Sequence, residues 1–389
     1  MKLTQIEKTK LRTWVELDKA SIKRNYQTFK KIIGNNCILM AVVKSNAYGH
    51  GLIPFSKELV RQGIKFLGVD SFDEALELRK AGIKTKIMVF GYVSPAFYKE
   101  AALKNISITI SNFPALQSLL KTKLKKKIKI HIKVDTGLGR QGFVVGDFKK
   151  VVKFLKKHKN IEIEGLYSHL AVGEDLKGRE YTMLQAERLN KWEIFFKKSG
   201  HRLLKHICAT SSAMFFPELH YDMVRVGIGM YGLWPSKETK SAVGKKYKLF
   251  PVLSWKTIVT ELKQIPKGVR IGYDLTEKLK RNSLLGVIPV GYWHGYPRLL
   301  SSKGIFNIKG KKVKLVGRVS MDMITLDLTG VPVKVGDEVA IIGGDYGHYA
   351  EADIMAQDSD TINYEITTRI NPIIKRFYRI NPLIKRFVK

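Results

Sequence analysis

The sequence predicts an α/β fold in which a (β/α)8 barrel of the TIM type is followed by a mostly β C-terminal domain. The chain has 389 residues, which suits one barrel of about 250 residues and a smaller partner. Through roughly the first 230 residues, short β-branched runs alternate with amphipathic helical stretches. After Leu233-Trp234-Pro235 helical signals become rare, and strand-like runs alternate with Gly and Pro turns.

The eight predicted barrel strands are Cys37–Val43, Phe66–Asp70, Lys86–Phe90, Ile106–Ile110, Ile128–Val134, Glu162–Tyr167, Lys205–Ala209 and Asp222–Val226. Residues 18–33 have the apolar spacing of an amphipathic helix, and Gly34 follows as its cap. Residues 73–81 and 182–199 also have helical patterns. Strands that alternate with helices form parallel βαβ units, and eight such units are typical of a closed barrel.

The C-terminal domain is predicted from four further strand-like runs, at Val252–Leu262, Leu284–Val290, Val313–Val319 and Ile324–Leu328. We place the barrel at residues 12–234 and the β-rich domain at 235–389. The short run Arg12–Leu17 precedes the first helix and is a candidate for joining the sheet of the second domain. At the end of the chain, Arg369–Phe377 recurs ten residues later as Arg379–Phe387, which a recent duplication of the tail explains.

The chain is strongly basic, with 69 Lys and Arg against 34 Asp and Glu and a net charge of +35. Such a charge suits nucleic acid or an anionic membrane. The basic residues recur along nearly every predicted helix, however, and no recognition motif accompanies them. We therefore expect no specific nucleic-acid partner.

Location and redox chemistry are also constrained by composition. No run of about 20 apolar residues could span a membrane, and the charged segment Met1–Leu11 lacks the apolar stretch of a secretory signal. We expect a cytoplasmic protein that does not insert into a membrane. Cys37 and Cys208 are the only cysteines and lie in apolar runs, so we expect buried free thiols and no metal site.

Reactive groups in a parallel barrel belong at the C-terminal ends of the strands. Lys44 directly follows the first predicted strand. A lysine that ends an apolar strand is a candidate Schiff-base residue, because desolvation keeps its amine reactive. A lysine that extends from the strand end to water explains the position equally well.

The other strand ends favour the chemical interpretation. Polar or small residues follow the fifth to seventh strands, or lie at the end of the eighth and just beyond it, namely Arg140, His169, Thr210, Ser211, Ser212, Arg225, Gly227 and Ile228. Small hydroxyl groups after strand seven and a glycine after strand eight suit the phosphate site common at that corner of a barrel. His169 taken singly is more readily explained as a structural hydrogen-bonding residue. Together, these residues predict a binding site at the barrel mouth.

The stretch AVVKSNAYGHG at residues 41–51 resembles the cofactor-lysine signature of the alanine racemase family. Further segments resemble that family in the same order along nearly the whole chain, at residues 133–140, 221–233, 271–276, 287–298, 317–322 and 361–366. Seven segments in family order are highly specific. The resemblance implies pyridoxal 5'-phosphate as cofactor, and interconversion of L-alanine and D-alanine that supplies D-alanine for peptidoglycan.

The resemblance also implies two bases, because racemisation removes a proton from one face of Cα and returns it on the other. Lys44 would hold the cofactor covalently and act as one base. Tyr273, in the C-terminal domain, would be the other and would reach the active site of a partner subunit. The working unit would therefore be a head-to-tail homodimer with shared active sites. His169 would assist Tyr273 through a hydrogen bond.

The remaining implied roles concern the cofactor and the substrate. Arg225 would face the pyridine nitrogen without protonating it. The phosphate would be bound by Tyr48, Ser211, Gly227 and Ile228. The substrate carboxylate would be held by Arg140 and the backbone of Met321. Lys133 matches a lysine that is carbamylated in some members and orients the arginine, and Tyr292 matches a tyrosine that lines the substrate entrance.

Three alternatives remain at this point. A decarboxylase of similar architecture would carry a carboxylate at the pyridine nitrogen instead of Arg225. A racemase for serine or a basic amino acid stays open, because side-chain selectivity depends on packing at the entrance. A cofactor carrier without catalysis would bind the cofactor but would have little use for Tyr273. Ser320, Thr210 and His294 depart from the family pattern, and none of them is one of the two bases.

Overall fold

The computed structural model describes residues 10–155, 159–343 and 351–379. The chain folds into two units. The first, called the barrel unit below, is Ser21–Ala47 with Phe55–Phe250. The second, called the C-terminal unit, contains the described residues up to Ala20, the segment Tyr48–Pro54 and the described residues from Pro251 onward. The domain limits expected from the sequence, 12–234 and 235–389, stay a prediction.

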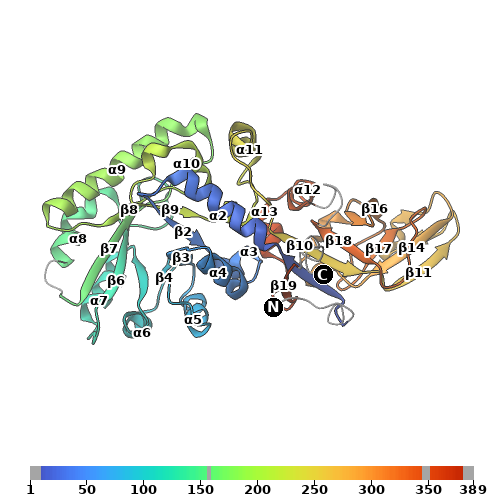
Figure 1. The fold of residues 1–389 in the computed structure, drawn as a ribbon, viewed down its shortest axis with the longest axis horizontal. Helices are drawn as coiled ribbons and strands as arrows, with labels where there is room; N and C mark the ends of the chain where they lie inside the picture. The colour runs from blue at the N-terminus through green and yellow to red at the C-terminus, as the bar shows by residue number, and fades with distance from the viewer. Residues whose placement is uncertain (1–9, 156–158, 344–350, 380–389) are drawn as a thin grey trace, which may run out of the picture. The chain divides into compact units, whose positions relative to one another are not determined.

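The barrel unit is built on a parallel sheet of eight strands in the order β8-β7-β6-β5-β4-β3-β2-β9 (Figure 1). The strands are β2 (Ile38–Val42), β3 (Phe66–Val69), β4 (Lys86–Val89), β5 (Ile106–Ile110), β6 (Ile128–Lys133), β7 (Ile161–Tyr167), β8 (Leu204–His206) and β9 (Met223–Val226). The two end strands are joined by backbone hydrogen bonds from Asp222 N to Lys205 O and from Arg225 N to Cys208 O, both 3.1 Å. The sheet therefore closes, and the predicted barrel of eight strands is confirmed.

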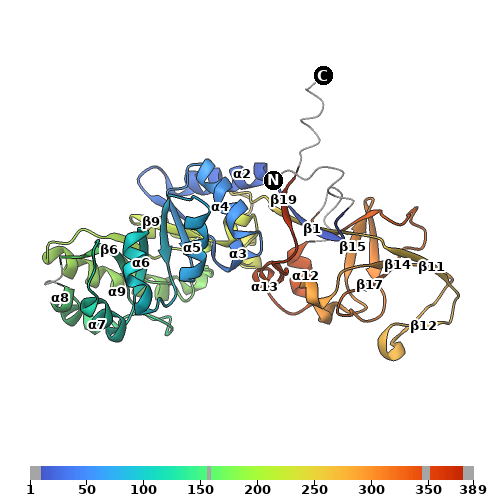
Figure 2. The ribbon, with the colours of Figure 1, turned by 90° about the horizontal axis from the view of Figure 1, so that it is seen from below.

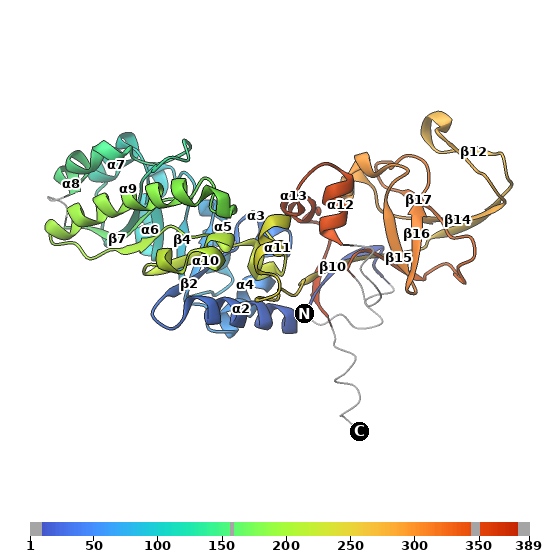
Figure 3. The same cartoon turned by 90° about the horizontal axis from the view of Figure 1, so that it is seen from above.

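Helices cover the outside of these strands (Figures 1 and 3). They are α2 (Lys19–Ile33), α4 (Leu52–Arg61), α5 (Phe72–Lys80), α6 (Tyr98–Leu103), α7 (Phe113–Lys121), α8 (Phe148–Leu155), α9 (Arg179–Lys198), α10 (Thr210–Phe215) and α11 (Lys237–Val243). The predicted amphipathic helix is α2, which buries Ile22, Phe29 and Ile33. It ends before Gly34, whose φ of +70° is left-handed and favours glycine.

The barrel interior is partly apolar and partly polar. Five buried side chains form an apolar cluster, namely Met40, Phe66, Met88, Tyr167 and Met223. The polar interior residues are described with the candidate site below. Cys37 and Cys208 are buried free thiols, as predicted. Burial raises the pKa of Cys37 to about 11 and that of Cys208 to about 12, so both thiols stay protonated.

The C-terminal unit contains a nine-stranded sheet in the order β11-β14-β17-β16-β15-β18-β10-β1-β19. The strands are β1 (Thr13–Leu17), β10 (Leu253–Ile258), β11 (Glu261–Ile265), β14 (Ser283–Ile288), β15 (Ile305–Ile308), β16 (Lys311–Leu315), β17 (Ile324–Asp327), β18 (Glu338–Ile342) and β19 (Arg376–Tyr378). Two short helices, α12 (Ala352–Asp358) and α13 (Asn363–Thr368), belong to the same unit. Strand β1 runs antiparallel to β10 and parallel to β19.

One predicted strand, Val252–Leu262, is wrong as a single element. Its residues form two strands, because β10 pairs with β1 and β18 whereas β11 pairs with β14. Between them Val259 N donates to Asp337 O and Thr260 N donates to Val287 O, so the chain changes partners there. Continuous apolar character cannot reveal such a change of partner.

A short hairpin of β12 (Arg270–Ile271) and β13 (Glu277–Lys278) stands out from the nine-stranded sheet (Figure 2). Its loop carries Tyr273. The first copy of the duplicated tail forms β19 and its approach, and most of the second copy lies outside the described residues. None of the helices in residues 10–155, 159–343 and 351–379 is both long and apolar enough to cross a membrane.

Candidate active site

Lys44 lies at the mouth of the barrel, directly after β2. The next four residues, Ser45, Asn46, Ala47 and Tyr48, have φ values between +51° and +56° and form a left-handed turn, α3 (Lys44–Tyr48). Such a conformation costs an L-residue about 1–2 kcal/mol, so the surroundings must hold it. Ala47 N donates to Val43 O at 2.9 Å, and Asn46 N donates to the Glu74 carboxylate at 3.2 Å. The Lys44 amine lies 3.7 Å from a carboxylate oxygen of Asp70.

Arg225 is buried in β9, the strand next to β2. Its Nη1 donates to His206 Nδ1 at 2.8 Å. Its Nη2 donates to Ser168 O, Ile207 O and His169 Nδ1 at 2.8, 3.0 and 3.1 Å. Burial lowers the pKa of Arg225 to about 10, which leaves it charged at neutral pH. The guanidinium is therefore a fixed cation inside the barrel.

His169 is a neutral donor in this environment. Burial, together with the positive charges of Arg225, Arg140 and other nearby cations, lowers the pKa of His169 to about 3. Because its Nδ1 accepts a hydrogen bond from Arg225, its ring hydrogen is on Nε2. His169 thus presents an N–H group rather than a base.

Lys133 and Arg140 add further positive charge at the mouth. Lys133 is buried, and its amine donates to Gln141 Oε1 at 2.8 Å. Burial lowers the pKa of Lys133. The nearby positive charges of Arg225, Arg140 and Lys44 repel the protonated amine and lower the pKa further, to about 8. An excess of cations at this mouth suits anionic ligands.

Arg140 is carried by a loop that Asp135 shapes. The Asp135 carboxylate accepts from the backbone N–H groups of Gly137, Leu138, Gly139 and Arg140 at 2.9, 2.9, 3.1 and 2.9 Å. Neither Asp135 nor Gln141 is among the site residues predicted from the sequence. An aspartate two residues before a glycine is a signal for such a turn, and it could have identified Asp135.

The small residues after β8 and β9 form a candidate phosphate site. Ser211 is buried, and within the described residues its hydroxyl has no hydrogen-bond partner. Thr210 Oγ1 accepts from Gly227 N at 3.2 Å and from Gly229 N at 3.5 Å, which fixes the turn after β9. Ile228 begins a 3-10 helix, Ile228–Tyr231. A buried hydroxyl left without a partner beside a helix start is a fitting cradle for an anion.

Three predicted residues lie on adjoining loops of the C-terminal unit. Tyr273 follows Gly272, which lies against Gly317 and Arg318, and Arg318 forms an ion pair with Asp274. Tyr292 N donates to Ser320 O at 3.1 Å, and Trp293 N donates to Met321 O at 3.0 Å. Tyr273 is 68% exposed, Met321 54% and Tyr292 43%. These side chains project from their unit instead of packing into it.

Tyr48 also belongs to the C-terminal unit, four residues after Lys44. Its ring centroid lies 5.9 Å from that of Tyr364, a residue that the sequence analysis did not select. The structure thus brings together eight predicted residues in the barrel unit, namely Lys44, Lys133, Arg140, His169, Ser211, Arg225, Gly227 and Ile228. The other four, Tyr48, Tyr273, Tyr292 and Met321, lie in the C-terminal unit.

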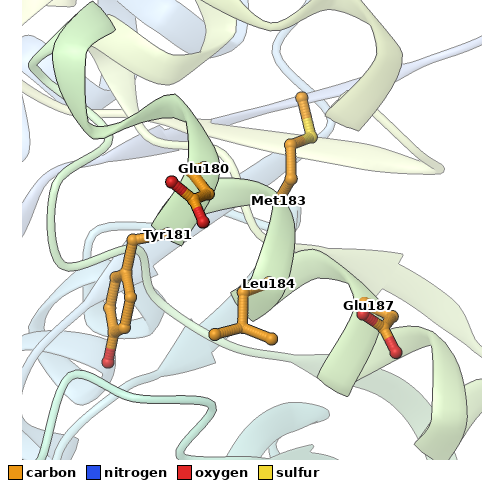
Figure 4. Close-up of a pocket in the computed structure, with 5 residues that line it drawn as sticks. All are labelled: Glu180, Tyr181, Met183, Leu184 and Glu187. Carbon is orange, nitrogen blue, oxygen red and sulfur yellow. The ribbon is translucent and has the colours of Figure 1, made fainter.

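A surface pocket adjoins the barrel mouth on α9. It is lined by Glu180, Tyr181, Met183, Leu184 and Glu187, whose side chains project from successive turns of the helix (Figure 4). Tyr181 donates to Gly137 O at 2.8 Å, which ties α9 to the loop that carries Arg140. Tyr181 and Leu184 remain partly exposed between Glu180 and Glu187, so a surface of mixed apolar and acidic character is left uncovered next to the site.

Comparison with known proteins gives a consistent match over most of the chain. The family model described as "Alanine racemase, N-terminal domain" matches residues 17–235, and the one described as "Alanine racemase, C-terminal domain" matches residues 252–378. The alanine racemase of Halothermothrix orenii is 38% identical over 377 residues, which cover 94% of this chain and 97% of the relative. That of Leptospira interrogans serovar copenhageni is 36% identical over 372 residues, covering 94% and 95%.

Solved structures agree with these sequence matches. An alanine racemase from Clostridium difficile 630 superposes with a TM-score of 0.90 at 28% identity, covering 95% of this chain and 96% of that one. The alanine racemase from Bacillus anthracis with bound L-Ala-P superposes with a TM-score of 0.89 at 33% identity, covering 95% of each chain.

Proposed function

The chain belongs to the alanine racemase family, and on this premise we propose which of its residues interconvert L-alanine and D-alanine. The observation that supports the assignment best is the set of cations at the barrel mouth. Lys44, Lys133, Arg140 and Arg225 all lie close enough to lower the pKa of His169. A cofactor phosphate and a substrate carboxylate are the anions that such a site needs. In this family the product serves peptidoglycan synthesis, and a cytoplasmic location suits that role.

The residues of the barrel unit fit pyridoxal phosphate. Lys44 would hold it covalently, and the unpartnered Ser211 hydroxyl with the backbone of Gly227 and Ile228 would bind its phosphate. Tyr48 would complete this set. When bound, the cofactor withdraws electrons from the substrate and so makes its Cα proton more acidic. Each proposed cofactor residue is thus supported by its place at a strand end or by an available polar group.

Arg225 would donate a hydrogen bond to the ring nitrogen. Four hydrogen bonds to acceptors of the barrel fix its guanidinium, and arginine does not give up a proton at neutral pH. The ring nitrogen would then stay unprotonated, which moderates electron withdrawal. A decarboxylase of similar architecture would carry a carboxylate at this position, and Arg225 therefore argues against that reaction.

Lys44 and Tyr273 would be the two bases, one on each face of the substrate. A tyrosine is protonated at neutral pH unless its phenolate is stabilised. The Nε2–H of His169 would donate to the Tyr273 oxygen and provide that stabilisation, because its Nδ1 is already occupied by Arg225. Each base would take the Cα proton in one direction of the reaction and return it in the other.

Arg140 and the backbone N–H of Met321 would bind the substrate carboxylate. Lys133 would position Arg140, either as an ammonium bonded to Gln141 or as a carbamate. Carbon dioxide reacts only with a neutral amine, and the lowered pKa of Lys133 makes that form accessible. Tyr292 would line the entrance to the site.

A head-to-tail homodimer would assemble these groups into complete active sites. In the C-terminal unit, six large side chains around the second base are exposed, namely Tyr273, Leu275, Tyr292, Trp293, Met321 and Met323. The barrel unit leaves the mixed apolar and acidic surface of α9 uncovered beside its mouth. Exposed apolar patches of this kind mark association surfaces, so two copies could cover each other's site.

The test is conversion of L-alanine to D-alanine by purified protein with added pyridoxal phosphate. We expect turnover in the wild type and none in Lys44→Ala, which removes the cofactor bond and one base. Absence of turnover in the wild type, despite a bound cofactor, would contradict the assignment of substrate. Serine, lysine and arginine would then be assayed in the same way, followed by a test for decarboxylation.

A further inference from the structure

A line of polar side chains crosses the barrel interior behind Arg225. Arg225 Nη1 donates to His206 Nδ1 at 2.8 Å. The Nε2 of His206 lies 3.0 Å from Nδ1 of His131, and Nε2 of His131 lies 3.2 Å from the Glu164 carboxylate. The four residues come from β9, β8, β6 and β7, and all four are buried. They therefore connect the candidate site with the opposite end of the barrel.

Glu164 ends this line as a fixed anion. Ser107 donates to its Oε2 at 2.6 Å, and the Lys86 ammonium forms an ion pair with its Oε1 at 2.7 Å, so Glu164 has a direct cationic partner as well as the histidine chain. Burial by itself raises the pKa of Glu164, but the hydrogen bonds from His131, Lys86 and Ser107 outweigh it and hold the pKa well below its usual range. The carboxylate can therefore only accept hydrogen bonds.

The direction of each hydrogen bond follows from the two ends of the line. An ionised Glu164 accepts, so His131 carries its hydrogen on Nε2 and accepts at Nδ1. His206 must then donate from Nε2 and accept from Arg225 at Nδ1. Arg225 can only donate, so both ends require the same tautomers. Burial lowers the pKa of both histidines, and both rings stay neutral.

The surroundings are shaped to hold the two rings. Gly165 lies opposite His131, and a Cβ at that position would come within 2.1 Å of His131 Nδ1. The register of β6 against β7 shifts between Ile130 and His131. Tyr167 stacks on His206 with ring centroids 4.8 Å apart and planes 5° apart. The space beside the His131 ring therefore exists because residue 165 is glycine, and any larger residue at this position would clash with the ring.

Arg225 needs a negative charge to offset its burial. Among the residues that the structure describes, no carboxylate is bonded to it, and its four acceptors are two carbonyl groups and two imidazoles. A buried cation without a counter-ion is costly. Glu164 is the ionised carboxylate at the other end of its hydrogen-bond chain.

We propose that Glu164 is the counter-ion of Arg225, acting through His131 and His206, and is therefore a positioning residue of the racemase. The negative charge makes His206 Nδ1 a stronger acceptor and so holds the guanidinium in place. The proposal rests on the role of Arg225 proposed above. Under this proposal Glu164 in β7 influences the reaction although it does not touch the cofactor. The rings of His131 and His206 lie between Glu164 and Arg225.

The experiment compares Glu164→Gln with Glu162→Gln, which changes an exposed residue of the same strand. The first readout is nuclear magnetic resonance of ¹⁵N-histidine-labelled protein without cofactor. In Glu164→Gln the Nε2–H proton signals of His131 and His206 should move upfield, because their chain ends on a weaker acceptor. In Glu162→Gln they should stay. This readout does not depend on racemase activity.

The second readout is the kinetics of alanine racemisation by the loaded enzyme. Glu164→Gln should lower kcat about 10-fold, as loss of an orienting partner behind a functional group does. The KM for alanine should change little, because Arg225 would not touch the substrate carboxylate. Signals and kcat equal to those of Glu162→Gln would overturn the proposal while leaving the racemase assignment intact.

The wild type provides a test that does not require the variant to fold. The proposal demands that His131 and His206 both be neutral with hydrogen on Nε2 in the cofactor-free protein at neutral pH. Either ring found with its hydrogen on Nδ1, or found as a cation, would overturn it. A wild type that meets this demand but does not racemise alanine would count against the proposed function instead.

Discussion

The two units present their functional groups in opposite ways. In the barrel unit, Arg225, Lys133 and Ser211 are buried, and hydrogen bonds of the barrel hold Arg225 and Lys133. In the C-terminal unit, Tyr273 and Met321 are exposed on loops. Buried groups on strands are rigid before any ligand arrives, whereas exposed loop groups gain a fixed position only when something packs on them. Under the proposed function, the barrel unit would receive the cofactor and the C-terminal unit would complete a site.

Backbone conformation shows the same contrast. The left-handed turn after Lys44 is anchored by bonds to Val43 O and the Glu74 carboxylate. In the Tyr273 loop, Asp274 and Leu275 have φ values of +59° and +51° and are exposed. Strain at a buried site is held by the fold, but strain in an exposed loop must be held by its own short-range contacts.

The largest effect is expected at Tyr273, the exposed residue proposed as the second base. Tyr273→Phe removes one hydroxyl that would take or return a proton, so racemisation should fall by about 1000-fold or more. The cofactor should remain bound, because Tyr273 is not among the cofactor residues. Racemisation rates and the cofactor absorbance would be measured together, with Tyr247→Phe as a control outside both groups. Wild-type activity in Tyr273→Phe would refute the two-base assignment.

Mixing two inactive variants tests whether the units of different subunits complete one another. Lys44→Ala and Tyr273→Phe subunits, unfolded and refolded together, should form half of their dimers as hybrids. Each hybrid would contain one intact pair of Lys44 and Tyr273, so about one quarter of wild-type activity should return. The assay is alanine racemisation against the ratio of the two variants. Activity that stays at the level of the separate variants would show that each site is made within one chain.

The C-terminal unit also fixes a cation, Arg376, and among the described residues its hydrogen bonds go to backbone carbonyl groups. Arg225 in the barrel unit differs, because two of its acceptors are histidine side chains. Arg376 donates to the carbonyl groups of Gly49, Ile370, Asn371, Pro372 and Ile374. Burial lowers its pKa to about 10, so it remains charged at neutral pH. Arg376→Ala should lower the free energy of unfolding by about 3 kcal/mol, because several carbonyl groups lose a charged donor.

Denaturant unfolding would measure the effect of Arg376→Ala. Arg369→Ala is the matched control, since its mostly exposed side chain forms a surface ion pair with Glu365 and should matter by about 0.5 kcal/mol or less. The measurement would be repeated with Arg386→Ala added. Arg386 corresponds to Arg376 in the second copy of the tail, and the double variant tests whether it replaces Arg376. Equal losses in Arg376→Ala and Arg369→Ala would contradict the structural role.

The smallest expected effect is the dependence of carbamate formation at Lys133 on pH. Burial lowers the pKa of Lys133 to about 8, and the positive charges of Arg225, Arg140 and Lys44 contribute to this shift. Its amine is protonated below that pH and neutral above it, so carbamate formation at constant dissolved carbon dioxide should rise from pH 7 to pH 9. Labelling with ¹³C carbon dioxide and recording the carbamate resonance would follow it, with Lys133→Met as the blank. A signal that is absent at pH 9, or equal in the blank, would contradict carbamate formation and leave Lys133 as an unmodified lysine bonded to Gln141.

Much of the barrel was predictable because its information is local. Each β-branched run and each apolar helical face is read from neighbouring residues, and β5 has the predicted bounds Ile106–Ile110. The rule that strand ends carry the chemistry then selected Lys44, His169 and Arg225. The resemblance to a family added Tyr273, which no pattern in its own segment would have selected.

Only the tertiary structure decided which distant residues meet. His131, Glu164 and His206 lie on three strands, and their hydrogen bonds exist because parallel pairing places β6, β7 and β8 side by side in the sheet. The left-handed turn places Tyr48 in the C-terminal unit although Lys44 belongs to the barrel. The run Val252–Leu262 divides because its residues pair with different strands. Sequence periodicity records which face of an element is buried, whereas the partner on that face depends on how the whole chain packs.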